Sequence, residues 1–180
     1  NDPETAKTMQ ILRAHGMEPR YYHKMVGWNA RIDALQAAML RVKLPHLNKW
    51  IDQRREAANR YVSLIQRNGL GGYLETPKEL HGRFHTYNQF VVKVAGGKRD
   101  GLMQSLKAQN IGCEIYYPLP LHLQECLEHL GHRAGDFPVS EAAAKRTLAL
   151  PIFPGITLEQ QETVVGACAS YLRAPIRLAA

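Results

Sequence analysis

A polar segment stands where a loop enters a predicted helix, Gly27-Trp28-Asn29-Ala30-Arg31. The first turn of a helix presents free backbone N–H groups and the positive end of the helix dipole, and both favour an anion. Asn29 carries an amide that can donate a hydrogen bond, and Arg31 carries a guanidinium that can hold an oxyanion in a fork. The segment therefore predicts an anion site, with phosphate as the natural ligand. The structural alternative is that Asn29 only caps the helix and that Arg31 only pairs with Asp33 or with solvent.

A second polar segment, residues 116–124, has the sequence Tyr-Tyr-Pro-Leu-Pro-Leu-His-Leu-Gln. Its two prolines restrict the backbone, so side chains on this loop would be held in place at little further entropic cost. Tyr116 and Tyr117 offer hydroxyl groups and His122 offers an imidazole, which predicts binding groups on a stiff loop. The structural alternative is that the tyrosines are strand residues, one on each face, and that His122 caps the following helix.

The remaining histidines and cysteines indicate no metal site. His23 lies in the loop before Asn29 and could approach an anion, and we group it with the substrate-binding candidates. Cys113, Cys126 and Cys168 are widely spaced and lack the spacing of zinc ligands, which favours a reducing compartment. We expect Cys113 to be buried packing. A P-loop, a dinucleotide-binding glycine pattern and a G-x-S-x-G elbow are all absent from the sequence.

Helices are expected to carry these segments in the first part of the chain. Asn1 or Asp2 can cap a helix with Pro3 in its first turn, and Gly16 would stop it. Residues 17–30 have neither helical nor strand periodicity and are predicted to form an ordered loop. From Arg31, apolar residues recur at spacings of three and four. Pro45 should break this helix near residues 43–46, and a second long helix should follow and end at Gly69.

Shorter elements are expected after a glycine-rich turn. The patterns predict strands at 87–94 and 111–117 around a helix at 99–110, an order that suits a small α/β layer. Further along, they predict a short helix at 124–130, a helix at 138–148, an extended piece at 150–152 and a final helix at 157–172. Thr157 should cap the final helix, with Gln160 reaching back to complete a capping box.

The composition is that of a soluble globular protein. The chain has 180 residues, 45% hydrophobic and 22% charged, and no apolar run approaches the length needed to span a bilayer. The formal net charge of +7 is compatible with a nucleic acid, a membrane surface or a phosphorylated small molecule. The basic residues are spread in ones and twos, so a solvated surface is the first interpretation, and we expect neither a nucleic-acid nor a membrane partner.

The chain has no secretory pattern, so we expect a cytoplasmic location, and its abrupt start suggests that a segment precedes it.

The run from Gly27 to Ala38 resembles the G-x-N-x-R-x-D-x-L-Q-A-A segment of the DegT/DnrJ/EryC1/StrS aminotransferases, which are pyridoxal-phosphate (PLP)-dependent sugar aminotransferases of fold type I. Later segments match in the same order, namely Tyr117-Pro118, Leu121 to Gln124, Phe137-Pro138, Leu148 to Pro154 and Thr157 to Gln160. The resemblance covers only the C-terminal part of such an enzyme. It therefore implies an α/β fold made of long interface helices followed by a small α/β domain.

The resemblance also implies roles for the candidate residues. Asn29 matches the family asparagine that reaches across a homodimer to the cofactor phosphate of the neighbouring subunit, and Arg31 would support that site. Tyr116, Tyr117 and His122 fall on the H-Y-P-x-P-x-H loop that lines the sugar-nucleotide side, although Tyr116 replaces the usual histidine. The Schiff-base lysine, the acidic partner of the pyridine nitrogen and the ring-stacking residue all lie before this chain begins. No catalytic residue is therefore expected in it, and the 180 residues alone should be inactive.

The implied reaction is transfer of an amino group from an amino acid, commonly glutamate, to a keto group of a nucleotide-linked sugar, in polysaccharide or antibiotic sugar biosynthesis. The implied domains are 1–30, the end of the large cofactor domain with an active-site loop; 31–70, long connecting and interface helices; and 71–180, the small domain. Two other hypotheses stay open. One is a non-catalytic regulatory or ligand-binding module on the same scaffold, and the other is a complete small α/β domain of unrelated role.

Overall fold

The computed structural model describes residues 1–174. Its contacts divide the chain into two compact units, the first ending at Leu47 and the second beginning at Asn48. The first unit contains helix α1 (Pro3–Leu12), helix α2 (Ala34–Lys43) and a 3-10 turn, η1 (Leu44–His46). The division falls inside the range 31–70 that the sequence groups as connecting helices. The three-part domain assignment stays a prediction.

Helix α1 and the loop after it form one hydrogen-bonded structure. Asp2 caps the helix by accepting the Glu4 backbone N–H at 3.1 Å, as predicted, and Pro3 stands in the first turn. The loop then returns to the end of the helix, where the Trp28 N–H donates to Leu12 O at 2.8 Å. The His15 N–H donates in turn to Trp28 O at 2.9 Å. The prediction that residues 17–30 form an ordered loop is confirmed.

Helix α2 begins later than predicted. Asp33 is its N-cap residue, and the Asp33 N–H donates to Gln36 Oε1 at 3.3 Å. The expected start at Arg31 was wrong because residues 31–33 remain extended before this cap. The break predicted at Pro45 is present as η1, since proline cannot donate the helical hydrogen bond at that position.

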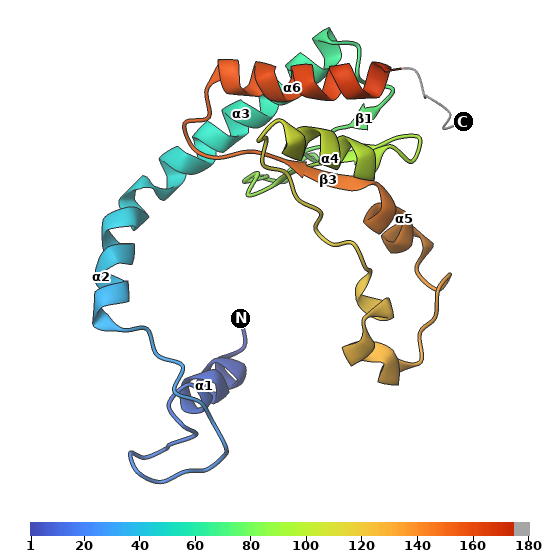
Figure 1. Ribbon diagram of the computed structural model, residues 1–180. Helices are drawn as coiled ribbons and strands as arrows, with labels where there is room; N and C mark the ends of the chain where they lie inside the picture. Colours follow the sequence, from blue (N-terminus) through green and yellow to red (C-terminus); the bar gives the residue numbers. More distant parts are fainter. Residues whose placement is uncertain (175–180) are drawn as a thin grey trace. The chain divides into compact units, whose positions relative to one another are not determined.

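The second unit is a three-stranded antiparallel sheet with helices packed on it (Figure 1). The strands are β1 (Leu74–Glu75), β2 (Phe90–Val94) and β3 (Thr147–Leu150), in the order β1-β2-β3. The α-helices are α3 (Leu47–Arg67), α4 (Arg99–Ala108), α5 (Pro138–Arg146) and α6 (Leu158–Arg173), and two 3-10 segments, η2 (Leu121–Leu123) and η3 (Glu125–Leu130), precede α5. Helices α4 and α6 pack against each other, and the capping box predicted for α6 is present.

The core forms on one face of the central strand. Phe90, Val92 and Val94 alternate along β2 and are fully buried, because successive side chains of a strand point to opposite faces. Helix α3 covers this face, and the Tyr61 ring stacks on Phe90 with 5.0 Å between ring centroids. Burial of apolar surface of this kind is the dominant favourable contribution to folding.

Several further predicted elements differ from the observed ones. The strand predicted at 87–94 begins only at Phe90, and the helix predicted at 124–130 is the 3-10 segment η3. Residues 111–117 do not form a strand but a single bridge, in which the Ala149 N–H donates to Glu114 O at 2.8 Å. Strand β3 pairs with β2 instead, and its residues were predicted to be the end of a helix and part of an extended piece at 150–152. The helix stops early because Thr147 adopts an extended backbone, while its hydroxyl donates to Ala143 O at 2.9 Å.

The cysteines differ sharply in exposure, and this predicts their reactivity. Cys113 and Cys168 are buried, which raises the pKa of the Cys113 thiol and raises that of Cys168 to about 12, whereas Cys126 is exposed. Because the thiolate is the reactive form, we expect one fast-reacting thiol with Ellman's reagent at mildly alkaline pH and two that react only on unfolding. Cys126→Ser should abolish the fast phase. A second fast thiol in the native protein would contradict the prediction.

Candidate functional site

Asn29 and Arg31 form a pair in the first unit. The Arg31 Nε donates to Asn29 Oδ1 at 3.2 Å, and both side chains are exposed. This bond occupies the amide oxygen, so the Asn29 NH2 group is left to donate outward beside the free end of the guanidinium. The pair therefore presents hydrogen-bond donors and one positive charge, which is what a phosphate requires.

Backbone contacts with the end of α1 hold this pair in place. Asn29 forms a β-bridge with Ala14, and the Ala30 N–H donates to Arg13 O at 3.0 Å. Gly27 allows the close approach, because a Cβ there would lie 2.5 Å from Leu12 O and would overlap other backbone atoms. The position of Asn29 thus depends on a glycine that lets two segments of backbone touch.

The structure contradicts capping by Asn29 and pairing of Arg31 with Asp33, while the guanidinium of Arg31 remains exposed to solvent. Asn29 lies before the extended residues that lead into α2 and does not cap it, since Asp33 has that position. Within residues 1–174, Arg31 makes no ion pair with Asp33 and bonds to Asn29 instead. The expected contribution of the helix N-terminus is also revised, because the donors here come from side chains that precede the helix.

His23 lies beside a separate hollow of the first unit. Its Nδ1 lies 2.8 Å from His15 O, and both histidines line a cavity of about 540 Å³ together with Lys24. Asn29 and Arg31 do not line this cavity, so the structure does not bring His23 to the pair. The cavity has a basic lining, and Lys24 is held by Glu18 at 2.7 Å.

Tyr116 and Tyr117 are exposed in the second unit. Their rings are nearly perpendicular, with 6.0 Å between centroids, and neither residue belongs to a strand, contrary to the structural alternative. Both line a cavity of about 210 Å³ with the first residues of the proline loop and with Ser140 and Thr147. The structure therefore leaves the two rings available to a ligand, as the loop prediction requires.

His122 has a partner within the protein that the sequence did not reveal. Its Nε2 lies 3.1 Å from Glu141 Oε1, its ring packs 4.8 Å from that of Phe137, and its side chain is only 7% exposed. It lies inside η2, so it does not cap a following helix. The contact between His122 and Glu141 holds the loop against α5.

The only sequence signal for Glu141 as the partner of His122 was an acidic residue in the first turn of a predicted helix. The prediction that His122 contacts substrate stays a prediction.

Glu141 predicts a pH dependence of this loop. The Gly135 N–H donates to Glu141 Oε1 at 2.8 Å, and this bond, with a smaller contribution from His122, holds the pKa of the carboxyl below its ordinary value. A group with a lowered pKa in the folded state stabilises that state above its ordinary pKa, about 4.3 for glutamate, and stops doing so as the pH falls through the lowered value. We expect the protection of amides in residues 121–137 from hydrogen exchange, relative to unfolded peptides at the same pH, to fall below about pH 4. Glu141→Gln should remove this acid-dependent step, and an unchanged pH profile in that variant would contradict the assignment.

Metal ligation and membrane insertion find no support in the part of the chain that the structure describes. Residues 1–174 contain no group of three or more His, Cys, Asp or Glu side chains that could hold a metal ion. The same residues include no helix with the length and apolar character needed to cross a membrane.

Residues 1–169 match the model of the DegT/DnrJ/EryC1/StrS aminotransferase family. The chain belongs to this family. The matched residues lie in both units. They include the Asn29–Arg31 pair and the loop that carries Tyr116 and Tyr117.

Several known proteins are similar in sequence to the chain. It is 44% identical over 173 residues to a pleiotropic regulatory protein of Geobacillus stearothermophilus, covering 96% of this chain and 46% of that protein. It is 36% identical over 159 residues to a UDP-N-acetyl-3-dehydro-alpha-D-glucosamine 3-aminotransferase of Acidithiobacillus ferrooxidans, covering 88% of this chain and 41% of that protein. The chain thus spans less than half the length of these relatives.

Solved structures of family members confirm the fold class. S. venezuelae DesV, solved in complex with a ketimine intermediate, superimposes on 97% of this chain with a TM-score of 0.85 and 30% identity, and 46% of DesV is covered. NtdA from Bacillus subtilis, solved with bound cofactor PMP, gives a TM-score of 0.81 and 27% identity over 96% of this chain and 40% of its own. The predicted α/β fold of a PLP-dependent transferase is therefore confirmed.

Proposed function

We propose that this chain is part of a PLP-dependent enzyme that transfers an amino group from an amino acid, with glutamate as the expected donor, to a keto group of a nucleotide-linked sugar. The observation that carries the proposal is the Asn29–Arg31 pair, which presents free donors on the family's own motif. The relatives named as nucleotide-sugar aminotransferases support the substrate class. The free cysteines are in keeping with a cytoplasmic, reducing location.

The fit of the pair to the cofactor rests on its donor set. The Asn29 NH2 group and the Arg31 guanidinium would donate to the phosphate of PLP, and the Asn29 oxygen is already satisfied by Arg31. When bound, the cofactor supplies an electron sink for the amino transfer. The lysine that carries it is expected outside this chain, so the contribution of these residues is to bind and orient.

The remaining candidates are assigned to the substrate. Tyr116 and Tyr117 would contact the nucleotide-linked sugar with exposed rings, and His23 would approach its diphosphate from the basic cavity. His122 would keep the tyrosine loop in place through Glu141. A net charge of +7 favours an anionic substrate of this kind.

A second subunit belongs to the same proposal. Helix α2 has no buried residue, and its large apolar side chains Leu35, Met39, Leu40 and Val42 are more than half exposed. Such a surface marks a contact with another protein segment. A homodimer would use it and would share Asn29 between subunits.

Asn29→Asp provides the test of the cofactor site, in the full product of the gene. The added carboxylate should repel the phosphate and weaken PLP binding by about 100-fold, as followed by a cofactor absorbance titration. Asn59→Asp, at an exposed asparagine of α3, is the matched control and should leave PLP binding unchanged. Release of 2-oxoglutarate from glutamate, dependent on a UDP-linked 3-keto sugar, tests the reaction. Full PLP affinity in the Asn29 variant would contradict the role of the pair.

One observation favours a second function. The relative that is 44% identical is named a pleiotropic regulatory protein, which is in keeping with a non-catalytic regulatory module on this scaffold. Such a module would bind PLP or a phosphorylated ligand without releasing 2-oxoglutarate. The same assay therefore separates the two functions.

A further inference from the structure

A cavity of about 240 Å³ opens in the second unit where the segment before β2 meets the end of β3. Asn88 and Gln89, immediately before β2, line one side of it, and Ala149 to Ile152 line another. Glu114 and Tyr116 complete the polar part of the lining. Of these residues, only Tyr116 belongs to the candidates predicted from the sequence.

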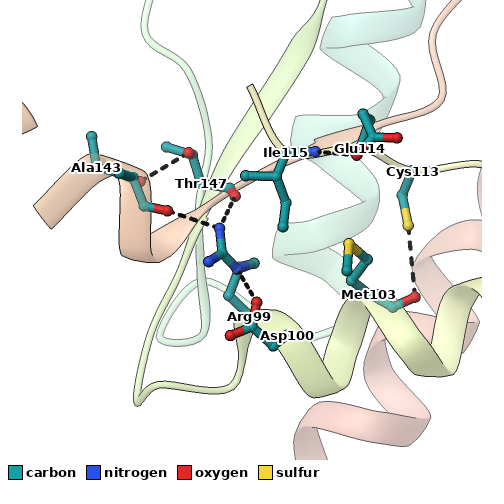
Figure 2. Close-up of polar contacts among 9 residues, drawn as sticks. Arg99, Asp100, Met103, Cys113, Glu114, Ile115, Ala143 and Thr147 are labelled. Atoms are coloured by element: carbon teal, nitrogen blue, oxygen red, sulfur yellow. Dashed lines mark hydrogen bonds and ion pairs between the residues drawn. The ribbon is translucent and has the colours of Figure 1, made fainter. Parts of the chain in front are cut away.

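The polar groups of this cavity have spare hydrogen-bonding capacity. Asn88 and Gln89 are exposed, and neither side-chain amide has a hydrogen-bond partner among residues 1–174. The Tyr116 hydroxyl is likewise without a hydrogen bond within that range, and the Tyr117 ring lies edge-on to the Tyr116 ring. Glu114 uses one oxygen, which accepts the Ile115 N–H at 3.0 Å (Figure 2), and its other oxygen is available. Two amides, a phenol and a carboxylate oxygen are therefore free in one cavity.

The walls of the cavity are fixed by hydrogen bonds and burial. Glu114 and Ala149 exchange two backbone hydrogen bonds, at 2.8 and 3.2 Å. Phe90, next to Gln89, is fully buried and pairs with Leu150 in the sheet register. Pro151 O accepts the Tyr61 hydroxyl at 2.8 Å. The backbone around the cavity is therefore ordered before a ligand binds.

The chemistry of the lining selects a neutral ligand rich in hydroxyl groups. The only ionisable groups among the lining residues are the Glu114 carboxyl, the Cys113 thiol and the Tyr116 phenol, with no lysine, arginine or histidine, so a phosphate would meet repulsion. Amides both donate and accept, a carboxylate accepts from hydroxyl groups, and an aromatic ring packs on the apolar face of a sugar. The basic cavity beside His15, His23 and Lys24 in the first unit has the opposite character.

We propose that Asn88, Gln89 and Glu114, with Tyr116, bind the sugar ring of the substrate by its hydroxyl groups and so determine which sugar is accepted. This inference rests on the proposed function and deepens it, because it assigns the neutral part of a nucleotide-linked sugar to this cavity. A sugar that lacks a hydroxyl bound by these groups would lose that hydrogen bond and would bind more weakly.

The test uses the full product of the gene, labelled with ¹⁵N, and methyl β-D-glucopyranoside as the probe. The side-chain NH2 signals of Asn88 and Gln89, identified from the spectra of their alanine variants, should shift saturably with a millimolar dissociation constant. Inorganic phosphate at the same concentrations should leave them unmoved. Gln89→Ala should weaken sugar binding by about fivefold, the value of one hydrogen bond. Gln104→Ala, at an exposed amide of α4, is the control and should bind as the native chain does.

Several results would overturn the proposal. They are the absence of a saturable shift in spectra that otherwise show a folded chain, an equal shift with phosphate, and unchanged sugar affinity in both Asn88→Ala and Gln89→Ala. Because both side chains are exposed, the variants should fold, and superposition of their remaining signals on those of the native chain checks this. The proposed reaction is tested separately. If the full gene product binds the sugar but releases no 2-oxoglutarate, the proposed aminotransferase activity is wrong and the proposed sugar site still holds.

Discussion

Replacing Arg99 with methionine is expected to lower the free energy of unfolding of the second unit by about 3 kcal/mol. Arg99 is only 7% exposed, although it carries a charge. One guanidinium nitrogen donates to Ala144 O at 2.9 Å and to Thr147 O at 3.2 Å, and Nε donates to the Asp100 carboxylate at 2.6 Å (Figure 2). The arginine thereby joins the start of α4 to the junction between α5 and β3.

The size of this effect comes from the acceptors that the substitution leaves behind. Methionine fills much of the volume but donates nothing, so two carbonyl groups lose their partner in a buried place. Urea unfolding followed by far-UV circular dichroism measures the change. Arg67→Met, at an exposed arginine in the last turn of α3, is the matched control and should change stability by less than about 0.5 kcal/mol. Equal stability of the two variants would show that Arg99 is not structural.

Gly27→Ala is expected to displace the loop that carries Asn29 and to weaken PLP binding as strongly as a change of Asn29 itself, by about 100-fold. The added Cβ would lie 2.5 Å from Leu12 O and 2.8 Å from the His15 carbonyl carbon. Both are backbone atoms, which cannot move aside as the end of a flexible side chain can. The hydrogen bonds between Trp28 and the end of α1 must then break.

Amide exchange and PLP titration together measure this effect. The Trp28 and Ala30 amides, which donate to Leu12 O and Arg13 O in the native chain, should exchange much faster in the variant. Gly71→Ala is the control, because a Cβ at Gly71 would meet nothing within 4 Å. Native exchange rates and native PLP affinity in Gly27→Ala would refute the argument that close backbone approach positions Asn29.

Local signals in the sequence predicted the elements whose causes are local. The Asp2 and Thr157 caps, the break at Pro45 and the alternating strand at Phe90–Val94 each depend on residues only a few positions apart. The family motif around Asn29 was also readable, and the family assignment it gave is confirmed. A capping box or the alternation of a strand involves only neighbouring residues, so it can be predicted without knowledge of the fold.

Pairings between distant residues could not be read in this way. No local pattern favoured a strand at 147–150 over the expected strand at 111–117, because strand pairing depends on which segments meet β2 in space. The partner of His122 is Glu141, and the partners of Arg99 lie at the end of α5. Each of these contacts joins residues far apart in the chain.

The sequence by itself determined the family, the helices with their caps, and the residue types offered to a phosphate at Asn29 and Arg31. Only the tertiary structure decided that the Asn29 oxygen is occupied by Arg31, so that its NH2 group is the free donor. It also decided that His122 is covered while Tyr116 is open, and that Asn88 and Gln89 join Tyr116 around one cavity. The physical reason is that propensity and capping act over a few residues, whereas exposure and hydrogen-bond partners are set by packing between segments that only folding brings together.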